Sequence, residues 1–134
     1  MSGSAITGVV AMLDVSDVER SSEFYKQLGF EVGNRDPASG KMFWAWLYSP
    51  QAPDWRRGPN LMLRSSEGEI RSTEQRIALY LYASELTVLR QALVDAGLSP
   101  SEISHPAYLP LGEFRLFDPD GYCLMIAQAT SNTP

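Results

Sequence analysis

The chain has 134 residues, of which 20% are charged and 44% hydrophobic, and this is typical of one globular domain with a core of its own. A formal net charge of −5 disfavours binding to nucleic acid, and the single cysteine, Cys123, excludes an intrachain disulfide and a cysteine metal cluster. No apolar run approaches the roughly 18 residues of a membrane span, and the N-terminus lacks the pattern of a signal peptide, so we expect no membrane partner and a cytoplasmic location.

The first half of the chain predicts a strand, a capped helix and further strands. Gly8–Val15 is rich in valine and other apolar residues, as strands are. Residues 16–19 (SDVE) fit the S-x-x-E capping box, and Gly29 supplies the stop of the helix that follows. We therefore expect a helix near 17–28, a strand that begins at 30–32 and breaks at the turn cluster 36–40 (DPASG), and further strands at 41–48 and 60–64. The polar stretch 65–75 lacks periodicity and is the expected connector, the least ordered interior segment.

The second half predicts the same order of elements. Arg76–Ala83 is expected to be a strand, and the leucine stripe after Ser84 predicts a helix near 85–96 that ends at Gly97. A proline-punctuated stretch follows. Residues 118–121 (DPDG) then form a turn signal between two alternating apolar runs, which predicts a β-hairpin.

The two halves can be aligned by one offset. A shift of 68 residues places Leu13 on Leu81, Ser16 on Ser84, and Gly29 on Gly97. Each half then consists of a strand, a helix of the same length, a glycine and further strands. This predicts one domain, 1–134, built from two modules at about 6–66 and about 76–128. An ordinary α+β domain without duplication stays open as the alternative.

Alternation along the strands separates a plain aliphatic face from a face that mixes aromatic and polar residues. In the first module the mixed face is expected to contain Val10, Met12, Asp14, Met42, Trp44, Trp46, Tyr48, Met62 and Arg64, with Phe43, Ala45 and Leu47 on the aliphatic face. In the second module it is expected to contain Ala78, Tyr80, Tyr82, Cys123, Met125 and Ala127, with Glu113 and Arg115. Such faces predict a lined ligand cavity. Burial at a subunit interface or in a second core is the alternative.

Three stretches carry a resemblance to a known family. DVERSSEFYKQLGFEV, ASELTVLRQALVDAGL and GEFRLFDPDGYCLMIAQ resemble the vicinal oxygen chelate (VOC) superfamily, which includes glyoxalase I, extradiol dioxygenases and bleomycin resistance proteins. The resemblance covers about residues 6–128. It implies an α+β fold of paired βαβββ modules, with eight strands in curved sheets around a cleft. It also implies a homodimer that completes each cleft.

The resemblance also locates the metal ligands of the enzymes in this family. Their His, Gln or Glu ligands fall here at Val10, near Met62, at Ala78 and at Met125. Alkyl and thioether groups cannot replace the nitrogen and oxygen ligands of Zn, Ni, Mn or Fe(II). The single histidine, His105, lies in a loop away from these positions. The resemblance is therefore to the metal-free, bleomycin-resistance-like branch, and we expect no metal and no cofactor.

These features favour a metal-independent small-molecule binder that sequesters a cationic aromatic antibiotic or metabolite. Aromatic faces attract cations, and acidic groups hold cationic tails. We expect no catalytic residue; the expected ligand-binding residues are Met12, Asp14, Trp44, Trp46, Arg64, Tyr80, Tyr82, Glu113, Arg115 and Met125, with Trp55 and Tyr108 contributing from loops.

Two alternatives to a binder stay open. One is a glyoxalase-like lyase or isomerase, or a dioxygenase, in which Asp14, Glu113 and Arg115 carry acid–base chemistry. An ion pair at the cleft rim is the simpler interpretation of these three residues. The other is a structural or regulatory protein with a vestigial cleft.

Overall fold

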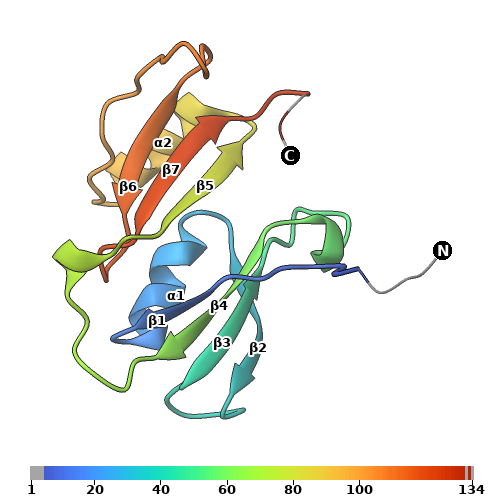
Figure 1. Cartoon of the computed structure of the whole chain (residues 1–134), viewed down its shortest axis with the longest axis vertical. Helices are drawn as coiled ribbons and strands as arrows, with labels where there is room; N and C mark the ends of the chain where they lie inside the picture. The colour runs from blue at the N-terminus through green and yellow to red at the C-terminus, as the bar shows by residue number, and fades with distance from the viewer. Residues whose placement is uncertain (1–4, 132, 134) are drawn as a thin grey trace. The chain divides into compact units, whose positions relative to one another are not determined.

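The computed structural model describes residues 5–131 and 133, and the chain divides into two compact units, Met1–Ile70 and Arg71–Pro134. Each unit has one α-helix on one face of one β-sheet (Figure 1). The α+β fold class and both helices expected from the sequence are confirmed. No helix among the described residues is long and apolar enough to cross a bilayer.

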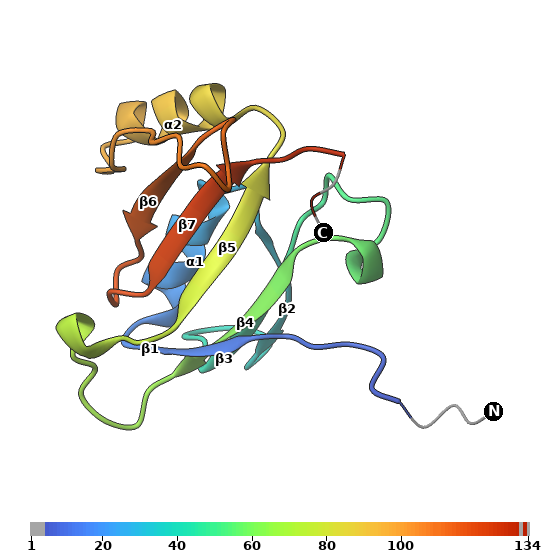
Figure 2. The same ribbon diagram turned by 45° about the horizontal axis from the view of Figure 1, so that its top comes forward.

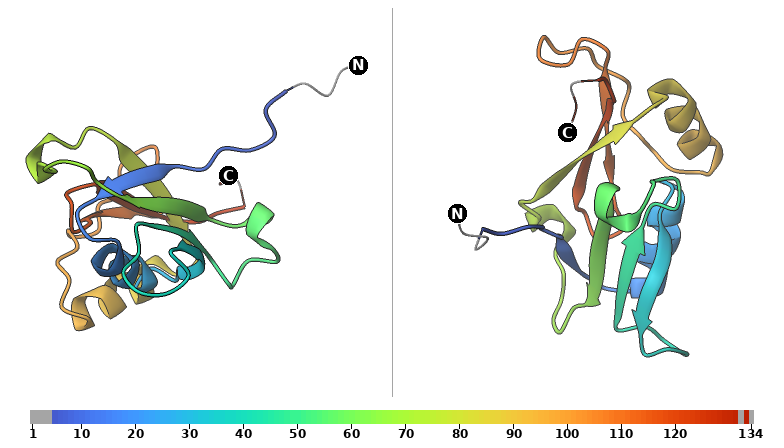
Figure 3. Two further views of the ribbon diagram at one scale, coloured as in Figure 1. Left: turned by 90° about the horizontal axis from the view of Figure 1, so that it is seen from below. Right: turned by 90° about the vertical axis from the view of Figure 1, so that its right-hand side faces the viewer.

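Unit 1 contains a four-stranded sheet. Its elements are β1 (Met12–Val15), α1 (Val18–Lys26), β2 (Glu31–Asp36), β3 (Trp44–Tyr48), a 3-10 turn η1 (Trp55–Arg57) and β4 (Asn60–Ser65). The strand order is β1-β4-β3-β2, with β1 and β4 parallel and the other pairs antiparallel. Helix α1 packs against β2, β3 and β4 (Figure 3). The core of the unit lies in this layer, where Leu13, Tyr25, Leu47 and Leu63 are buried.

The predicted capping box at the start of α1 is wrong. The N-cap is Asp17, whose carboxylate accepts a hydrogen bond from the Arg20 backbone N–H at 3.1 Å. Ser16 instead accepts from the Arg20 guanidinium, at 2.7 Å. The Glu19 carboxylate does not turn back to the cap because it accepts the backbone N–H of Met42, at 2.7 Å. A contact 23 residues away in sequence has therefore replaced the local one.

The same contact explains why the expected faces of residues 42 and 43 are reversed. Met42 is 7% exposed and Phe43 is 62% exposed, the opposite of what alternation along 41–48 predicts. Strand β3 begins only at Trp44, and the bond to Glu19 holds the Met42 backbone two residues before it. From Trp44 onward the alternation holds, and Ala45 and Leu47 are buried as expected.

Unit 2 contains a three-stranded sheet. Its elements are a 3-10 turn η2 (Ser72–Glu74), β5 (Ala78–Ala83), α2 (Leu86–Asp95), β6 (Glu113–Phe117) and β7 (Cys123–Gln128). The strand order is β5-β7-β6, with β5 and β7 parallel and β6 and β7 forming the antiparallel hairpin. Helix α2 packs against β7 and lies along one face of this sheet (Figure 2).

The expectation of eight strands is wrong for the described part of the chain, which has seven. The second strand of module two is reduced to an isolated bridge between Ser104 and Glu113. Beside it, the Arg115 backbone N–H bonds to the Ser101 hydroxyl at 2.8 Å rather than to a backbone carbonyl. The Ser101 hydroxyl thus takes the place of a backbone carbonyl of a neighbouring strand. Prolines at 100 and 106 flank the segment, and proline lacks the N–H that pairing between strands needs.

The two helices end in the same way, as the offset of 68 residues predicts. Gly29 and Gly97 have φ values of 97° and 87°. The Phe30 N–H bonds to the Tyr25 carbonyl, and the Leu98 N–H bonds to the Leu93 carbonyl. These are the bonds of a Schellman-type helix end, which requires a left-handed residue that glycine adopts at little cost.

The predicted 118–121 turn connects β6 to β7. Gly121 has a φ of 88°. One oxygen of the buried Asp118 carboxylate accepts the backbone N–H groups of Asp120 and Tyr122, each at 2.9 Å. The turn fixes the register of the hairpin, and that register determines which side chains share a face.

Candidate functional site

Unit 1 presents a mixed aromatic and polar face on the side of its sheet opposite α1. Paired residues on neighbouring strands project from the same face. The register pairs Met12 with Met62 and Met62 with Trp46, and it pairs Asp14 with Arg64 and Arg64 with Trp44. We call the set of Met12, Asp14, Trp44, Trp46, Tyr48, Met62 and Arg64 the unit-1 face. The five strand residues that the sequence predicted for a binding site in this half all belong to it.

Two rings of the unit-1 face form a flat stack. Trp46 and Tyr48 have ring centroids 5.3 Å apart and an interplanar angle of 9°. The Trp46 indole N–H donates to the Asn60 side-chain oxygen at 3.2 Å, which fixes the orientation of the ring. Gly33 on β2 leaves room for the stack, because a Cβ at Gly33 would lie 2.5 Å from the Trp46 ring and 2.8 Å from the Tyr48 ring. A β-bulge between Val32 and Asn34 brings this glycine against the rings.

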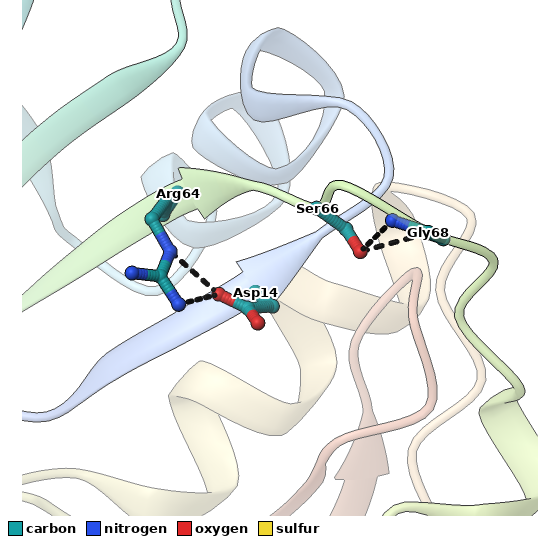
Figure 4. Close-up of polar contacts among 4 residues, drawn as sticks. All are labelled: Asp14, Arg64, Ser66 and Gly68. Atoms are coloured by element: carbon teal, nitrogen blue, oxygen red, sulfur yellow. Dashed lines mark hydrogen bonds and ion pairs between the residues drawn. The ribbon is translucent and has the colours of Figure 1, made fainter.

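An ion pair joins two further residues of the unit-1 face. Both Nε and Nη2 of Arg64 lie 2.9 Å from Oδ1 of Asp14 (Figure 4). The hydrogen bond and the charge of Asp14 raise the pKa of Arg64. Because both side chains are about half exposed, water screens the pair and it contributes little to stability. Its effect is to hold one charge of each sign beside Trp44.

Unit 2 presents a second mixed face, again on the side of the sheet opposite its helix. One cross-strand row is Tyr80, Met125 and Arg115, and the next is Tyr82, Ala127 and Glu113. We call the set of Tyr80, Tyr82, Glu113, Arg115, Phe117, Cys123 and Met125 the unit-2 face. The Tyr80 and Tyr82 rings are stacked with centroids 6.2 Å apart, and the Arg115 guanidinium lies over the Phe117 ring at 5.5 Å.

A buried carboxylate lies at one end of the unit-2 face. Glu113 is 4% exposed. The Tyr80 hydroxyl donates to its Oε1 at 2.7 Å, and the Tyr108 hydroxyl donates to its Oε2 at 3.0 Å. In the part of the chain that the structure describes, Glu113 forms no ion pair. The hydrogen bond to Glu113, together with partial burial, raises the pKa of Tyr80 above its ordinary value.

We expect Tyr80 to ionise later than an exposed tyrosine when the pH is raised. The chain has six tyrosines, so spectrophotometric titration near pH 11, about one unit above the ordinary tyrosine pKa, counts those that have ionised. Wild type and Tyr80→Phe should give equal tyrosinate absorbance there. Because the folded-state pKa is raised, the stabilisation from this bond is complete below about pH 10 and is lost as the pH rises through the raised pKa. A signal smaller in Tyr80→Phe by the absorbance of one tyrosinate would contradict this expectation.

The residues at the metal-ligand positions implied by the resemblance do not fit a Zn, Ni, Mn or Fe centre. Val10 precedes β1, Met62 lies beside Met12, Ala78 beside Cys123, and Met125 beside Tyr80. None of the four implied positions carries a nitrogen or oxygen ligand. Within residues 5–131 and 133, no group of three His, Cys, Asp or Glu side chains is placed to hold a metal ion.

The sequence analysis also named three loop residues, Trp55, His105 and Tyr108, and of these only Tyr108 contacts a residue of the two faces in the described part of the structure. Tyr108 contacts Glu113, as described above. Trp55 lies in η1, and its side chain is outside the described part of the structure. The ring of His105 is exposed, with Nδ1 3.0 Å from the Pro110 carbonyl oxygen. Sequence reasoning missed Gly33 and Asn60, although a glycine within a predicted strand is a signal of close approach.

Comparison with known proteins matches no family model and no curated protein, but it finds solved structures with the same fold. A bleomycin-binding protein complexed with bleomycin superposes with a TM-score of 0.71 and 18% identity, over 92% of this chain and 98% of that one. TnmS3, an antibiotic binding protein from a Streptomyces species, gives 0.67 and 19%, over 92% and 97%. A glyoxylase/bleomycin resistance protein/dioxygenase domain from a Frankia species gives 0.68 and 18%, over 96% of each chain. The chain therefore has the fold of the bleomycin resistance and glyoxalase/dioxygenase proteins, which is the fold that the sequence resemblance implied.

Proposed function

We propose that the chain is a metal-independent binding protein that sequesters a cationic aromatic small molecule, an antibiotic or a metabolite. The observation that carries this proposal is the composition of the two mixed faces. Each face combines stacked aromatic rings with a carboxylate. Neither face offers a nitrogen or oxygen ligand at the positions where the metal enzymes of the resembled family place theirs.

The physical chemistry of these faces suits such a ligand. Flat indole and phenol rings stack on planar groups, and a cation near them gains about 0.5–2 kcal/mol. The net charge of −5 attracts cations from a distance. Two of the structures with the same fold are named as antibiotic-binding or bleomycin-binding proteins, which supports small-molecule binding as the general function.

The Trp46→Ala variant tests the proposal by tryptophan fluorescence, with bleomycin and other cationic aromatic compounds as probes. Wild type should show saturable quenching, and Trp44 should report binding in the variant. We expect the variant to bind about 10-fold more weakly, because it loses a ring contact worth about 1–2 kcal/mol. High salt should weaken binding in both proteins.

Val88→Ala is the control for this titration, because Val88 is an exposed apolar residue of α2 that lies outside both mixed faces. It should bind as wild type does. Equal weakening in Val88→Ala would show that the weakening in Trp46→Ala does not report on the unit-1 face. Turnover of the methylglyoxal–glutathione adduct that EDTA abolishes would favour the glyoxalase-like alternative instead. Location in the cytoplasm stays a prediction.

We also propose that the chain forms a homodimer. Strands β1 and β5 are edges of their sheets, and open edges pair readily with other chains. The extended segment before β1 carries Ile6 and Val9, which are 87% and 88% exposed. We expect light scattering at micromolar concentration to give twice the chain mass. A monomer mass at that concentration would refute the dimer without affecting the two faces.

A further inference from the structure

The loop 105–112 is folded back on itself and is joined to the rest of unit 2 at its base. Ser104 and Glu113 exchange both backbone hydrogen bonds, at 2.8 and 2.9 Å. Inside the loop, the Leu109 N–H bonds to the Pro106 carbonyl, and the Gly112 N–H bonds to the Leu109 carbonyl. Gly112 has a φ of 107°, so the chain turns sharply where it enters β6. The loop is thus a compact unit with its two ends close together, a form that often serves function.

One side-chain contact holds the tip of this loop to the sheet. Among the described residues, the hydrogen bond from Tyr108 to Glu113 is the one side-chain hydrogen bond from loop 105–112 to the rest of unit 2. The Tyr108 residue is otherwise 69% exposed. A loop whose tip is held by one side-chain hydrogen bond from a largely exposed residue belongs to the low-stability parts of a structure, which open without global unfolding.

The two tyrosines that bind Glu113 are not equivalent. Tyr80 belongs to β5, and its hydroxyl lies 2.7 Å from Oε1. Tyr108 belongs to the loop, and its hydroxyl lies 3.0 Å from Oε2. Opening of the loop therefore releases Oε2 while Tyr80 continues to orient the carboxylate. A buried carboxylate that forms no ion pair is costly, so an exposed Oε2 is a strong acceptor for a cation.

We propose that loop 105–112 is a latch: Tyr108 holds it closed over Glu113, and an ammonium group of the ligand binds Glu113 Oε2 by replacing the Tyr108 hydroxyl. This inference rests on the proposed function in that it takes the ligand to be cationic. It assigns the cation to Glu113 rather than to Asp14, whose Oδ1 already binds Arg64 at 2.9 Å. The Tyr108 hydroxyl is a neutral donor, whereas an ammonium group supplies the positive charge that the buried Glu113 carboxylate lacks among the described residues, which favours the exchange.

Hydrogen exchange of the full chain without ligand tests the latch. Tyr108→Phe should raise the exchange rates of the two loop amides that donate backbone hydrogen bonds, Leu109 and Gly112, about 10-fold, as expected for one lost hydrogen bond to a charged group. Tyr82→Phe is the matched control, because Tyr82 lies in the same cross-strand row as Glu113 and has no hydrogen bond to it among the described residues. It should leave these rates within about twofold of wild type. Unchanged rates in Tyr108→Phe would overturn the latch.

A pair of probes tests the replacement by a cation. Benzylammonium, followed by amide chemical shifts, should raise loop exchange in wild type, whereas benzyl alcohol should not. Tyr108→Phe should bind benzylammonium several-fold more tightly than wild type, because the competing hydroxyl is gone. Binding without faster loop exchange, or weaker binding by Tyr108→Phe, would overturn the proposal.

Absence of benzylammonium binding is also informative. If bleomycin binds wild type and benzylammonium binds neither protein, the cation site at Glu113 is wrong and the proposed function stands. If bleomycin also fails to bind, the proposed function fails with it. The exchange rates of ligand-free Tyr108→Phe report on the contact that holds the loop in either case.

Discussion

Replacing Phe114 by alanine is expected to lower the free energy of unfolding by about 3–5 kcal/mol. Phe114 is 1% exposed and lies on the aliphatic face of β6, beside Ile126 of β7. Its removal leaves a cavity in the layer between the sheet and α2. Since a domain of this size is stable by only about 5–15 kcal/mol, urea denaturation should show a midpoint shifted far below that of wild type.

The neighbouring residue provides the control for this prediction. Arg115 is exposed and projects from the opposite face of the same strand, where it lies over Phe117. Arg115→Ala should therefore cost less than about 1 kcal/mol. The two substituted residues are neighbours in sequence and lie on opposite faces of β6. A larger loss of stability in Arg115→Ala than in Phe114→Ala would invert the assignment of faces in unit 2.

Substitution of Gly33 by alanine should destabilise the protein by about 1–3 kcal/mol, the usual cost of overpacking. The added Cβ would lie 2.5 Å from the Trp46 ring, so either the Trp46–Tyr48 stack or β2 must move. We expect urea denaturation to show the loss of stability and near-ultraviolet circular dichroism to show the altered stack. Binding of bleomycin should weaken as well, because the ring surface of the unit-1 face is disturbed.

Gly8→Ala is the control for this second prediction. No atom lies within 4 Å of a Cβ built at Gly8, and its φ is not positive. Its stability should change by no more than about 0.5 kcal/mol. If Gly33→Ala kept both the wild-type stability and the wild-type dichroism, the close packing of Gly33 against Trp46 would be refuted.

The parts of the fold that local sequence chemistry determines were predictable. The helix bounds followed from the apolar spacing and from Gly29 and Gly97, whose left-handed conformation only glycine adopts at little cost. The hairpin followed from the 118–121 turn. Alternation placed the predicted residues of each half on one face, because the strands from Trp44 onward are regular.

The features that long-range contacts determine were not predictable. Glu19 matched a local capping rule, but its carboxylate binds Met42, and this contact also reversed the faces of Met42 and Phe43. The missing strand depends on the Ser101 hydroxyl taking the place of a backbone carbonyl. Alternation placed Tyr80 and Glu113 on one face, but a period of two residues does not specify which hydroxyl reaches which carboxylate oxygen.

The family resemblance added information of another kind. It implied the fold, and the superposed structures confirm that fold. The expected ligand-binding residues remain predictions that a binding experiment must test. The expected absence of a metal remains a prediction that elemental analysis must test.

Equilibrium dialysis of EDTA-treated protein against bleomycin, with mass spectrometry of the recovered ligand, tests the central claim most directly. We expect saturable retention of the ligand without added metal, and recovery of the ligand chemically unchanged. Retention that requires added Zn, Ni, Mn or Fe, or recovery of an altered ligand, would contradict a metal-independent binding protein.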